Sequence, residues 1–156
     1  MEALPELNLP PCGLKMRPDA DSRRGGMEVY DVTRRRWVAL TPEEWVRQNF
    51  VNYLFSFKAY PASLTANEVA LHLNGLSRRC DTVVYDRRLR PLLVVEYKAP
   101  SVHITQKVFD QIARYNIVMG APYLIVSNGR SHYCCRFEGD SYSFLREIPA
   151  YTDITD

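Results

Sequence analysis

The chain has 156 residues, of which 46% are hydrophobic and 24% are charged, and its formal net charge is +2. This length suits one domain with a buried core, and the composition excludes a disordered or fibrous chain. The longest uninterrupted aliphatic run is Leu92 to Val95, far short of the roughly 20 apolar residues that cross a bilayer. Nothing at the start of the sequence resembles a signal peptide. We therefore expect a soluble cytoplasmic protein with one functional site.

Cysteine and arginine usage narrows the chemistry. The cysteines show no C-x-x-C spacing, which disfavours a zinc site and a disulfide framework; they are Cys12, Cys80, Cys134 and Cys135. Sixteen of the 20 basic residues are Arg, and most of them are clustered at residues 23–24, 34–36, 78–79 and 87–90. Guanidinium groups suit phosphate oxygens, but the same clusters also fit a solvated surface encoded by a GC-rich genome. The charge pattern alone leaves both interpretations open.

The start of the chain differs in composition from the rest. Residues 1–26 contain four of the ten prolines and Gly25-Gly26, a pattern typical of a mobile or surface-draped arm. A single domain is expected over residues 27–156. Its first elements, Met27–Val32 and Arg36–Leu40, favour a short hairpin.

A helix is predicted directly after this hairpin. Thr41-Pro42-Glu43-Glu44 supplies an N-cap, a proline at the first helical position and a glutamate three residues after the cap. Apolar residues then recur at three- and four-residue steps, which predicts an amphipathic helix that reaches about Lys58, before Pro61. These residues are Val46, Phe50, Tyr53, Leu54 and Phe57.

Three strand-like runs follow the first helix. They are Asn67–Leu73, Cys80–Asp86 and Leu92–Tyr97, and they are separated by Asn74-Gly75 and by residues 87–91. Short runs that are separated by turn residues are typical of neighbouring antiparallel strands. We therefore expect an antiparallel meander.

The remainder of the chain predicts one helix and three strands. Apolar spacing indicates a helix over Thr105–Met119, with Gly120 where it ends. Strands are expected at residues 123–127, 132–137 and 142–145, with a turn at Asn128-Gly129. The fold class is thus α/β (α+β): helix, three antiparallel strands, helix, strand, in a mixed sheet flanked by helices, with extra strands at both ends.

Two acids in the second and third strands of this meander are the candidate site. If residues 87–90 form the hairpin loop, Asp86 pairs with Pro91 and Asp81 lies directly opposite Glu96. Lys98 shares the face of Glu96, because side chains alternate along a strand. Opposed like charges destabilise a sheet, so a cation is expected between them.

Mg²⁺ meets this need, because it takes oxygen ligands and is usually held by one or two carboxylates plus a phosphate. Such an ion would hold a phosphate group and offset charge during its transfer, and Lys98 would orient a water and stabilise the same charge. The alternative for these three residues is a surface salt-bridge cluster without function. Their shared face and register favour the site.

These motifs resemble the PD-(D/E)XK nuclease superfamily, and within it the N-terminal nuclease domain of type I restriction enzyme R subunits. The resemblance rests on Asp81, on Glu96-Tyr97-Lys98-Ala99-Pro100 and on residues 110–116, and it runs from about Thr41 to Gly129. The proline that usually precedes the motif's first acid is Cys80 here. The core order of helix, three antiparallel strands, helix and strand is that of the superfamily.

The resemblance implies that Asp81, Glu96 and the main-chain carbonyl of Tyr97 bind Mg²⁺, for which Mn²⁺ is a substitute, and that Lys98 is catalytic. Gln111 matches the first residue of a Q-x-x-x-Y motif that lies beside the site and is included among the catalytic residues.

Three further expectations concern neighbouring residues. Tyr115 completes the Q-x-x-x-Y motif, although a core aromatic is the alternative. Glu44 matches a first-helix acid that often joins the metal site, whereas a capping-box partner for Thr41 is the other interpretation. The expected DNA contacts are Arg78, Arg79, Lys107, Arg114 and Tyr115.

The resulting hypothesis is a Mg²⁺-dependent DNA endonuclease domain. Its expected partners are DNA and other restriction or repair subunits, and a homodimer would supply the second site that a double-strand cut requires. The main rival is a catalytically silent DNA-binding or assembly module that keeps the fold and uses its Arg clusters for backbone contacts. A scaffold that binds no nucleic acid is the third alternative.

Overall fold

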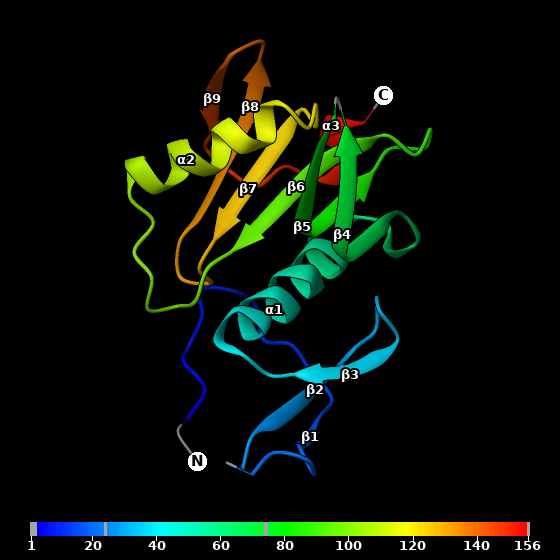
Figure 1. Ribbon diagram of the computed structural model, residues 1–156, viewed down its shortest axis with the longest axis vertical. Coiled ribbons are helices and arrows are strands. Elements are labelled where there is room, and N and C mark those ends of the chain that lie inside the picture. Colours follow the sequence, from blue (N-terminus) through cyan, green and yellow to red (C-terminus); the bar gives the residue numbers. More distant parts are fainter. Residues whose placement is uncertain (1–2, 24, 74, 156) are drawn as a thin grey trace.

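The computed structural model describes residues 3–23, 25–73 and 75–155, which form a three-stranded and a six-stranded sheet (Figure 1). The strands are β1 (Met16–Pro18), β2 (Met27–Asp31), β3 (Arg36–Ala39), β4 (Thr65–Leu73), β5 (Leu76–Tyr85), β6 (Pro91–Tyr97), β7 (Tyr123–Ser127), β8 (His132–Glu138) and β9 (Ser141–Leu145). The helices are α1 (Pro42–Phe57), the 3-10 turn η1 (Ala62–Leu64), α2 (Gln106–Ile117) and α3 (Tyr151–Ile154). Sequence patterns did not predict η1 and α3, which are three and four residues long.

The small sheet has the order β1-β2-β3, with both pairs antiparallel. The predicted hairpin of β2 and β3 is confirmed. The predicted arm of residues 1–26 contributes β1 to this sheet, and its earlier part lies along the main body, where the Asn8 N–H donates to the Gly129 carbonyl at 2.8 Å. The division of the chain into an arm and a domain stays a prediction.

Helix α1 begins and ends close to the predicted positions. The Thr41 hydroxyl accepts from the Glu44 N–H at 3.1 Å, and Pro42 occupies the start of the first turn, where its missing N–H costs nothing. Val46, Phe50 and Leu54 are fully buried, as the apolar stripe predicts. Phe57, which the stripe also included, is 59% exposed, because the helix ends there and its last turn passes the edge of the core.

The large sheet has the order β4-β5-β6-β7-β8-β9 and is mixed. Strands β4, β5 and β6 form the predicted antiparallel meander, β7 runs parallel to β6, and β8 and β9 add antiparallel strands beyond β7. A parallel neighbour requires a crossover, which α2 supplies. The predicted order of helix, three antiparallel strands, helix and strand is thus confirmed. Among the helices of the described ranges, none has the length and apolarity to cross a membrane.

The turn between β5 and β6 differs from the prediction. Tyr85, not Asp86, pairs with Pro91, and the register shifts between Val84 and Tyr85. Asp86 belongs to the turn, where its carboxylate accepts from the Arg88 and Arg90 main-chain N–H groups at 2.9 Å each. An aspartate that captures nearby N–H groups is a common turn device, so it competes with continued strand pairing. The other predicted turn includes Asn74, which lies outside the described residues.

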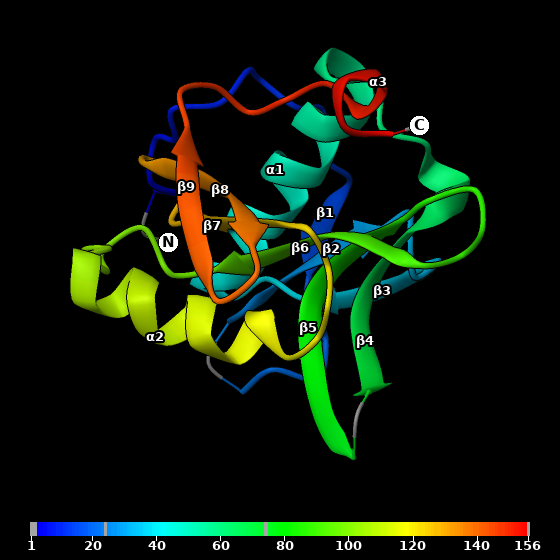
Figure 2. The same cartoon turned by 90° about the horizontal axis from the view of Figure 1, so that it is seen from above.

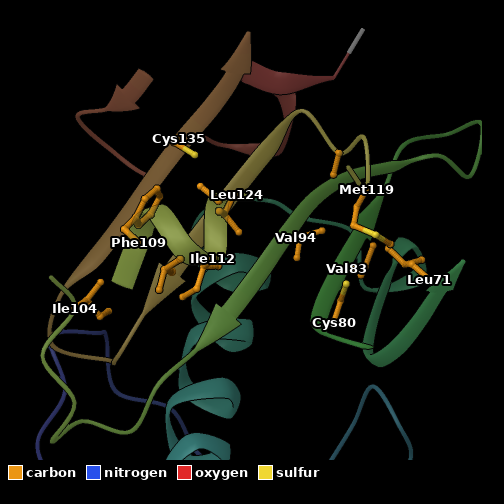
Figure 3. Close-up of a cluster of buried hydrophobic side chains, with 13 residues drawn as sticks. Leu71, Cys80, Val83, Val94, Ile104, Phe109, Ile112, Met119, Leu124 and Cys135 are labelled. Atoms are coloured by element: carbon orange, nitrogen blue, oxygen red, sulfur yellow. The ribbon is translucent and has the colours of Figure 1, made fainter. Parts of the chain in front are cut away.

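The helices α1 and α2 cover opposite faces of the large sheet (Figure 2). On the α2 face, a buried cluster joins Phe109 and Ile112 of the helix to Val94, Leu124 and other strand residues (Figure 3). On the α1 face, a second cluster joins the helix to Leu93, Val95, Tyr97 and Ile125. Strand β6 is therefore buried on both faces, which explains its continuous aliphatic run.

Candidate functional site

The candidate site lies where strand β5 passes the carboxyl end of β6. The register of these strands includes Thr82↔Val95 and Val83↔Val94. Asp81 and Glu96 are the next residues on the two strands, in the opposed positions that the sequence suggested. The register shift near the turn compensates for the different turn residues. The negative charge of the Asp81 carboxylate acts on Glu96 and raises its pKa. The two predicted acids are therefore close neighbours.

The pairing of β5 with its other neighbour, β4, is interrupted at Asp81. Asn67 pairs with Thr82 and Val69 pairs with Cys80, whereas Glu68 and Asp81 lie unpaired between them. Glu68 has a φ of +56°, in the left-handed region that non-glycine residues rarely adopt. As a result, the side chains of the β4–β5 hairpin change faces at this point. Val69 and Cys80 pack on the α2 cluster, whereas Asn67 and Thr82, two residues away on the same strands, lie on the α1 side.

The interruption leaves polar groups of Asp81 available for other contacts. Its carboxylate accepts from the Tyr97 main-chain N–H at 2.9 Å, and its carbonyl accepts from Arg47 Nη1 at 3.3 Å. One contact ties Asp81 to the end of β6, and the other ties it to α1. The carboxylate is thereby held beside the strand that carries Glu96.

Glu96 is largely buried. Its side chain is 12% exposed, and Arg78 Nη2 donates to its carboxylate at 2.7 Å. Burial and the neighbouring Asp81 carboxylate raise the pKa of Glu96 to about 7, although the Arg78 guanidinium opposes this rise. One guanidinium therefore does not fully compensate two adjacent acids.

Lys98 directly follows β6. Its main-chain N–H donates to the Ser127 carbonyl at 2.8 Å, which continues the contact between β6 and β7 for one residue. The side chain is half-buried, and its ammonium forms no ion pair with a carboxylate in the ranges that the structure covers. Lys98 thus provides a cation two residues after Glu96 that forms an ion pair with neither acid.

Helix α2 brings one of its two motif residues to the site. Tyr115 is 65% exposed, so it is not a core aromatic, and the Arg78 guanidinium lies 5.3 Å from its ring centroid. Arg78 thus links Tyr115 to Glu96. Gln111 is exposed one turn earlier on α2.

The other predicted DNA contacts differ in availability. Arg79 Nε donates to Glu68 at 2.6 Å, so this guanidinium is engaged inside the protein although its side chain is 69% exposed. Lys107 and Arg114 are exposed on α2.

The Glu44 carboxylate does not act as a capping-box partner. Its carboxylate accepts from Arg34 Nη2 at 2.5 Å and from Gln48 Nε2 at 3.1 Å, so it does not complete a capping box with Thr41. Within residues 3–23, 25–73 and 75–155, no group of three or more His, Cys, Asp and Glu side chains could hold a metal ion. The expected role of Glu44 at the metal site stays a prediction.

Glu44 belongs to a largely buried network of ion pairs that sequence patterns did not reveal. Its acids are Asp31, Glu44 and Glu68, and its guanidinium groups are those of Arg34, Arg47 and Arg79. The only signal in the sequence is the spacing of Glu44 and Arg47, which puts them on one side of a helix. That spacing does not tell a buried pair from a solvated one, because the further partners, Arg34 of Glu44 and Glu68 of Arg47, come from distant elements.

Two surface hollows lie away from the acids. One, of about 500 Å³, is lined mainly by α2, β8 and β9, including Phe109, Tyr133 and Phe144. The other, of about 380 Å³, lies between the start of the chain and α1 and includes Trp45. Neither is lined by Asp81, Glu96 or Lys98, so the acid pair is not at the base of these hollows.

A comparison with models of protein families found a match for this sequence. The model of the family described as type I restriction enzyme R protein N terminus (HSDR_N) matches residues 42–149, which include α1, the whole of the large sheet and α2. A comparison with curated proteins found no match. The family match covers more than half of the chain and contains Asp81, Glu96 and Lys98. The chain therefore belongs to the family of type I restriction enzyme R protein N-terminal domains.

Proposed function

We propose that this domain is a Mg²⁺-dependent endonuclease that hydrolyses phosphodiester bonds in DNA. The observation that carries the proposal is the adjacent pair of Asp81 and Glu96, which a single guanidinium compensates incompletely. The membership of the chain in a restriction enzyme R protein family supports a nuclease role for this pair.

The donor set suits a hard divalent cation. Two carboxylates and the main-chain carbonyl of Tyr97 would supply oxygen ligands, the type that Mg²⁺ and Mn²⁺ prefer, and the buried Glu96 would gain a counterion. When bound, the cation would hold the scissile phosphate and offset the negative charge that develops on it. The thiol of Cys80 is buried in the α2 cluster and is not needed for this role.

The side chains around the acids have complementary roles in this proposal. The unengaged ammonium of Lys98 would orient the attacking water, help to remove its proton and stabilise the phosphate charge. Gln111 would contact the substrate from α2. Arg78 would leave Glu96 to contact a DNA phosphate, and Tyr115 would remain as its neighbour.

The exposed cations of α2, Lys107 and Arg114, would contact the DNA backbone. Arg79 would join them only if Glu68 released it. Other restriction subunits are the expected protein partners, and cutting both strands of a duplex requires two such sites, which a homodimer would provide.

The decisive experiment is nicking of supercoiled plasmid by the purified protein with Mg²⁺ or Mn²⁺. We expect cutting that stops in EDTA. The Lys98→Ala variant should lower the cutting rate by at least about 100-fold, because the loss of one group that stabilises transition-state charge costs that much. Lys58→Ala is the matched control, since Lys58 is also half-buried but lies at the end of α1 beside Tyr53.

Two outcomes would replace the proposal. Wild-type protein that does not cut, but binds DNA with an affinity that falls steeply with salt, would be a catalytically silent binding or assembly module. Protein that neither cuts nor binds DNA would be a scaffold.

A further inference from the structure

A continuous series of buried ion pairs connects the small sheet to the acid pair. Arg34, which follows β2, donates to Asp31 and, at 2.5 Å, to Glu44 of α1. Glu44 in turn lies 3.3 Å from Arg47 Nε, an ion-pair contact without hydrogen-bond geometry. Arg47 then reaches β4 and β5. Asp31, Glu44 and Arg47 are each at most 6% exposed.

Arg47 makes several contacts that no other side chain could make at once. Its Nη2 donates to Glu68 of β4, its Nη1 donates to the main-chain carbonyl of Asp81 at 3.3 Å, and its guanidinium lies 5.8 Å from the Tyr97 ring centroid. A planar guanidinium can serve acceptors in two directions, whereas a lysine ammonium is a compact charge on a flexible stem. Arg47 therefore fixes Glu68 and Asp81 relative to α1.

These contacts fall at the interruption in the sheet. Glu68 and Asp81 do not pair with each other, and Glu68 adopts a left-handed conformation that costs free energy for a residue with a side chain. At such a position, strand pairing does not set the place of the main chain. The Arg47 contacts with both residues replace that missing constraint, and the Asp81 carboxylate then reaches the Tyr97 N–H.

We propose that Arg47 is a positioning residue that holds the main chain of Asp81 so that its carboxylate stays beside Glu96 in a geometry that binds a divalent cation. The inference rests on the proposed function for the cation itself. Arg47 acts through Asp81 and contacts neither the cation nor the substrate.

The test compares Arg47→Lys with Arg34→Lys. Both substitutions remove a buried guanidinium that contacts two carboxylates, but only Arg47 also contacts Asp81. The first measurement is hydrogen exchange of the Tyr97 amide in metal-free protein. We expect Arg47→Lys to speed this exchange by at least about 10-fold more than Arg34→Lys does, because the Asp81 carboxylate no longer holds the N–H.

The second measurement is Mn²⁺ affinity by calorimetry, at a temperature where both variants are folded. We expect Arg47→Lys to weaken binding by about 10- to 100-fold, the usual effect of losing a group that orients a metal ligand. Arg34→Lys should stay within about twofold of the wild type. Equal affinities in Arg47→Lys and wild type, or equal losses in the two variants, would overturn the inference.

A milder variant covers the case in which Arg47→Lys does not fold. Glu68→Gln loosens Arg47 from β4 at a partly exposed acid, and we expect it to weaken Mn²⁺ binding by about 3- to 10-fold. Unchanged affinity in Glu68→Gln would then reject the role of Arg47. Wild-type protein that binds no Mn²⁺ would contradict the proposed function instead, while the Tyr97 exchange comparison would still decide whether Arg47 positions Asp81.

Discussion

Two buried groups of acids in this protein have opposite electrostatic characters. In the ion-pair network, three acids meet three guanidinium groups, and the contacts with Arg34 and Arg47 outweigh burial so that the pKa values of Asp31 and Glu68 are lowered. At the acid pair, the Arg78 guanidinium forms an ion pair with Glu96, and the pKa of Glu96 rises to about 7 because of burial and the Asp81 charge.

The difference separates a structural role from a ligand-binding one. Acids with matched partners hold elements together, since removing one partner leaves an uncompensated buried charge. Under the proposed function, the acids that lack a full set of partners would bind a cation. The predictions below test whether each group behaves according to its own balance of charge.

The largest expected effect is on stability, in the network. Asp31→Asn should lower the free energy of unfolding by about 3 kcal/mol, because the side chain accepts from Arg34, Asn67 and the Thr33 main-chain N–H, and its loss leaves Arg34 without one acid. Urea denaturation measures this change. Asp21→Asn, at an exposed acid, is the control and should be nearly neutral. A loss below about 1 kcal/mol would place Asp31 among ordinary surface acids.

The same variant should change how stability depends on pH. The pKa of Asp31 is lowered in the folded protein, so its stabilising contribution is present above the unfolded pKa, near 4, and is lost as the pH falls through the folded value. The gap between wild type and Asp31→Asn should therefore shrink from pH 6 to about pH 3. Denaturation curves across this range provide the measurement. A constant gap would show that packing, not charge, makes the residue important.

The next effect concerns cation binding at the acid pair. Glu96→Gln should weaken Mn²⁺ binding by at least about 100-fold, because the loss of a ligand exceeds the usual effect of losing its support. The melting temperature in EDTA should not fall, since the substitution removes repulsion with Asp81. Calorimetry and thermal denaturation measure the two quantities, with the exposed Glu147→Gln as control. A stability loss without an affinity loss would make Glu96 a structural acid.

A smaller effect is expected at Arg78, the guanidinium that pairs with Glu96. Arg78→Ala should strengthen Mn²⁺ binding by about fivefold, because the ion pair with Glu96 competes with the cation. DNA binding by the same variant should weaken, since one phosphate contact is lost. Fluorescence anisotropy with labelled DNA measures the second change. Weaker Mn²⁺ binding in this variant would mean that Arg78 supports the cation site and does not compete for it.

The smallest effect is expected at an exposed ion pair outside both groups. Arg17 Nε donates to Glu28 at 2.7 Å, and the Arg17 side chain is 50% exposed. Arg17→Ala should cost no more than about 1 kcal/mol, even though the guanidinium also lies over the Trp37 ring, because solvent screens the pair. A urea titration suffices as the measurement. A cost near that of Asp31→Asn would invalidate the contrast between buried and exposed pairs.

Much of the fold and part of the site could be predicted from local patterns. Thr41-Pro42 marks the start of α1, the aliphatic run of β6 indicates a strand buried on both faces, and the spacing of Asp81, Glu96 and Lys98 suggests the candidate site. The assumed turn was wrong, because Asp86 captures N–H groups of the loop. The predicted register of Asp81 and Glu96 still held, since a register shift near the turn compensated for the error.

The sequence by itself determined most of the helices and strands, because apolar periodicity and caps act between residues that are close along the chain. Only the tertiary structure decided that Glu44 pairs with Arg34 and that Arg47 pairs with Glu68, because these partners come from separate elements and have no shared local signal. It also decided the difference between the two groups of acids. Charge balance depends on which guanidinium groups arrive by folding, and burial then magnifies that balance because the interior screens charge weakly.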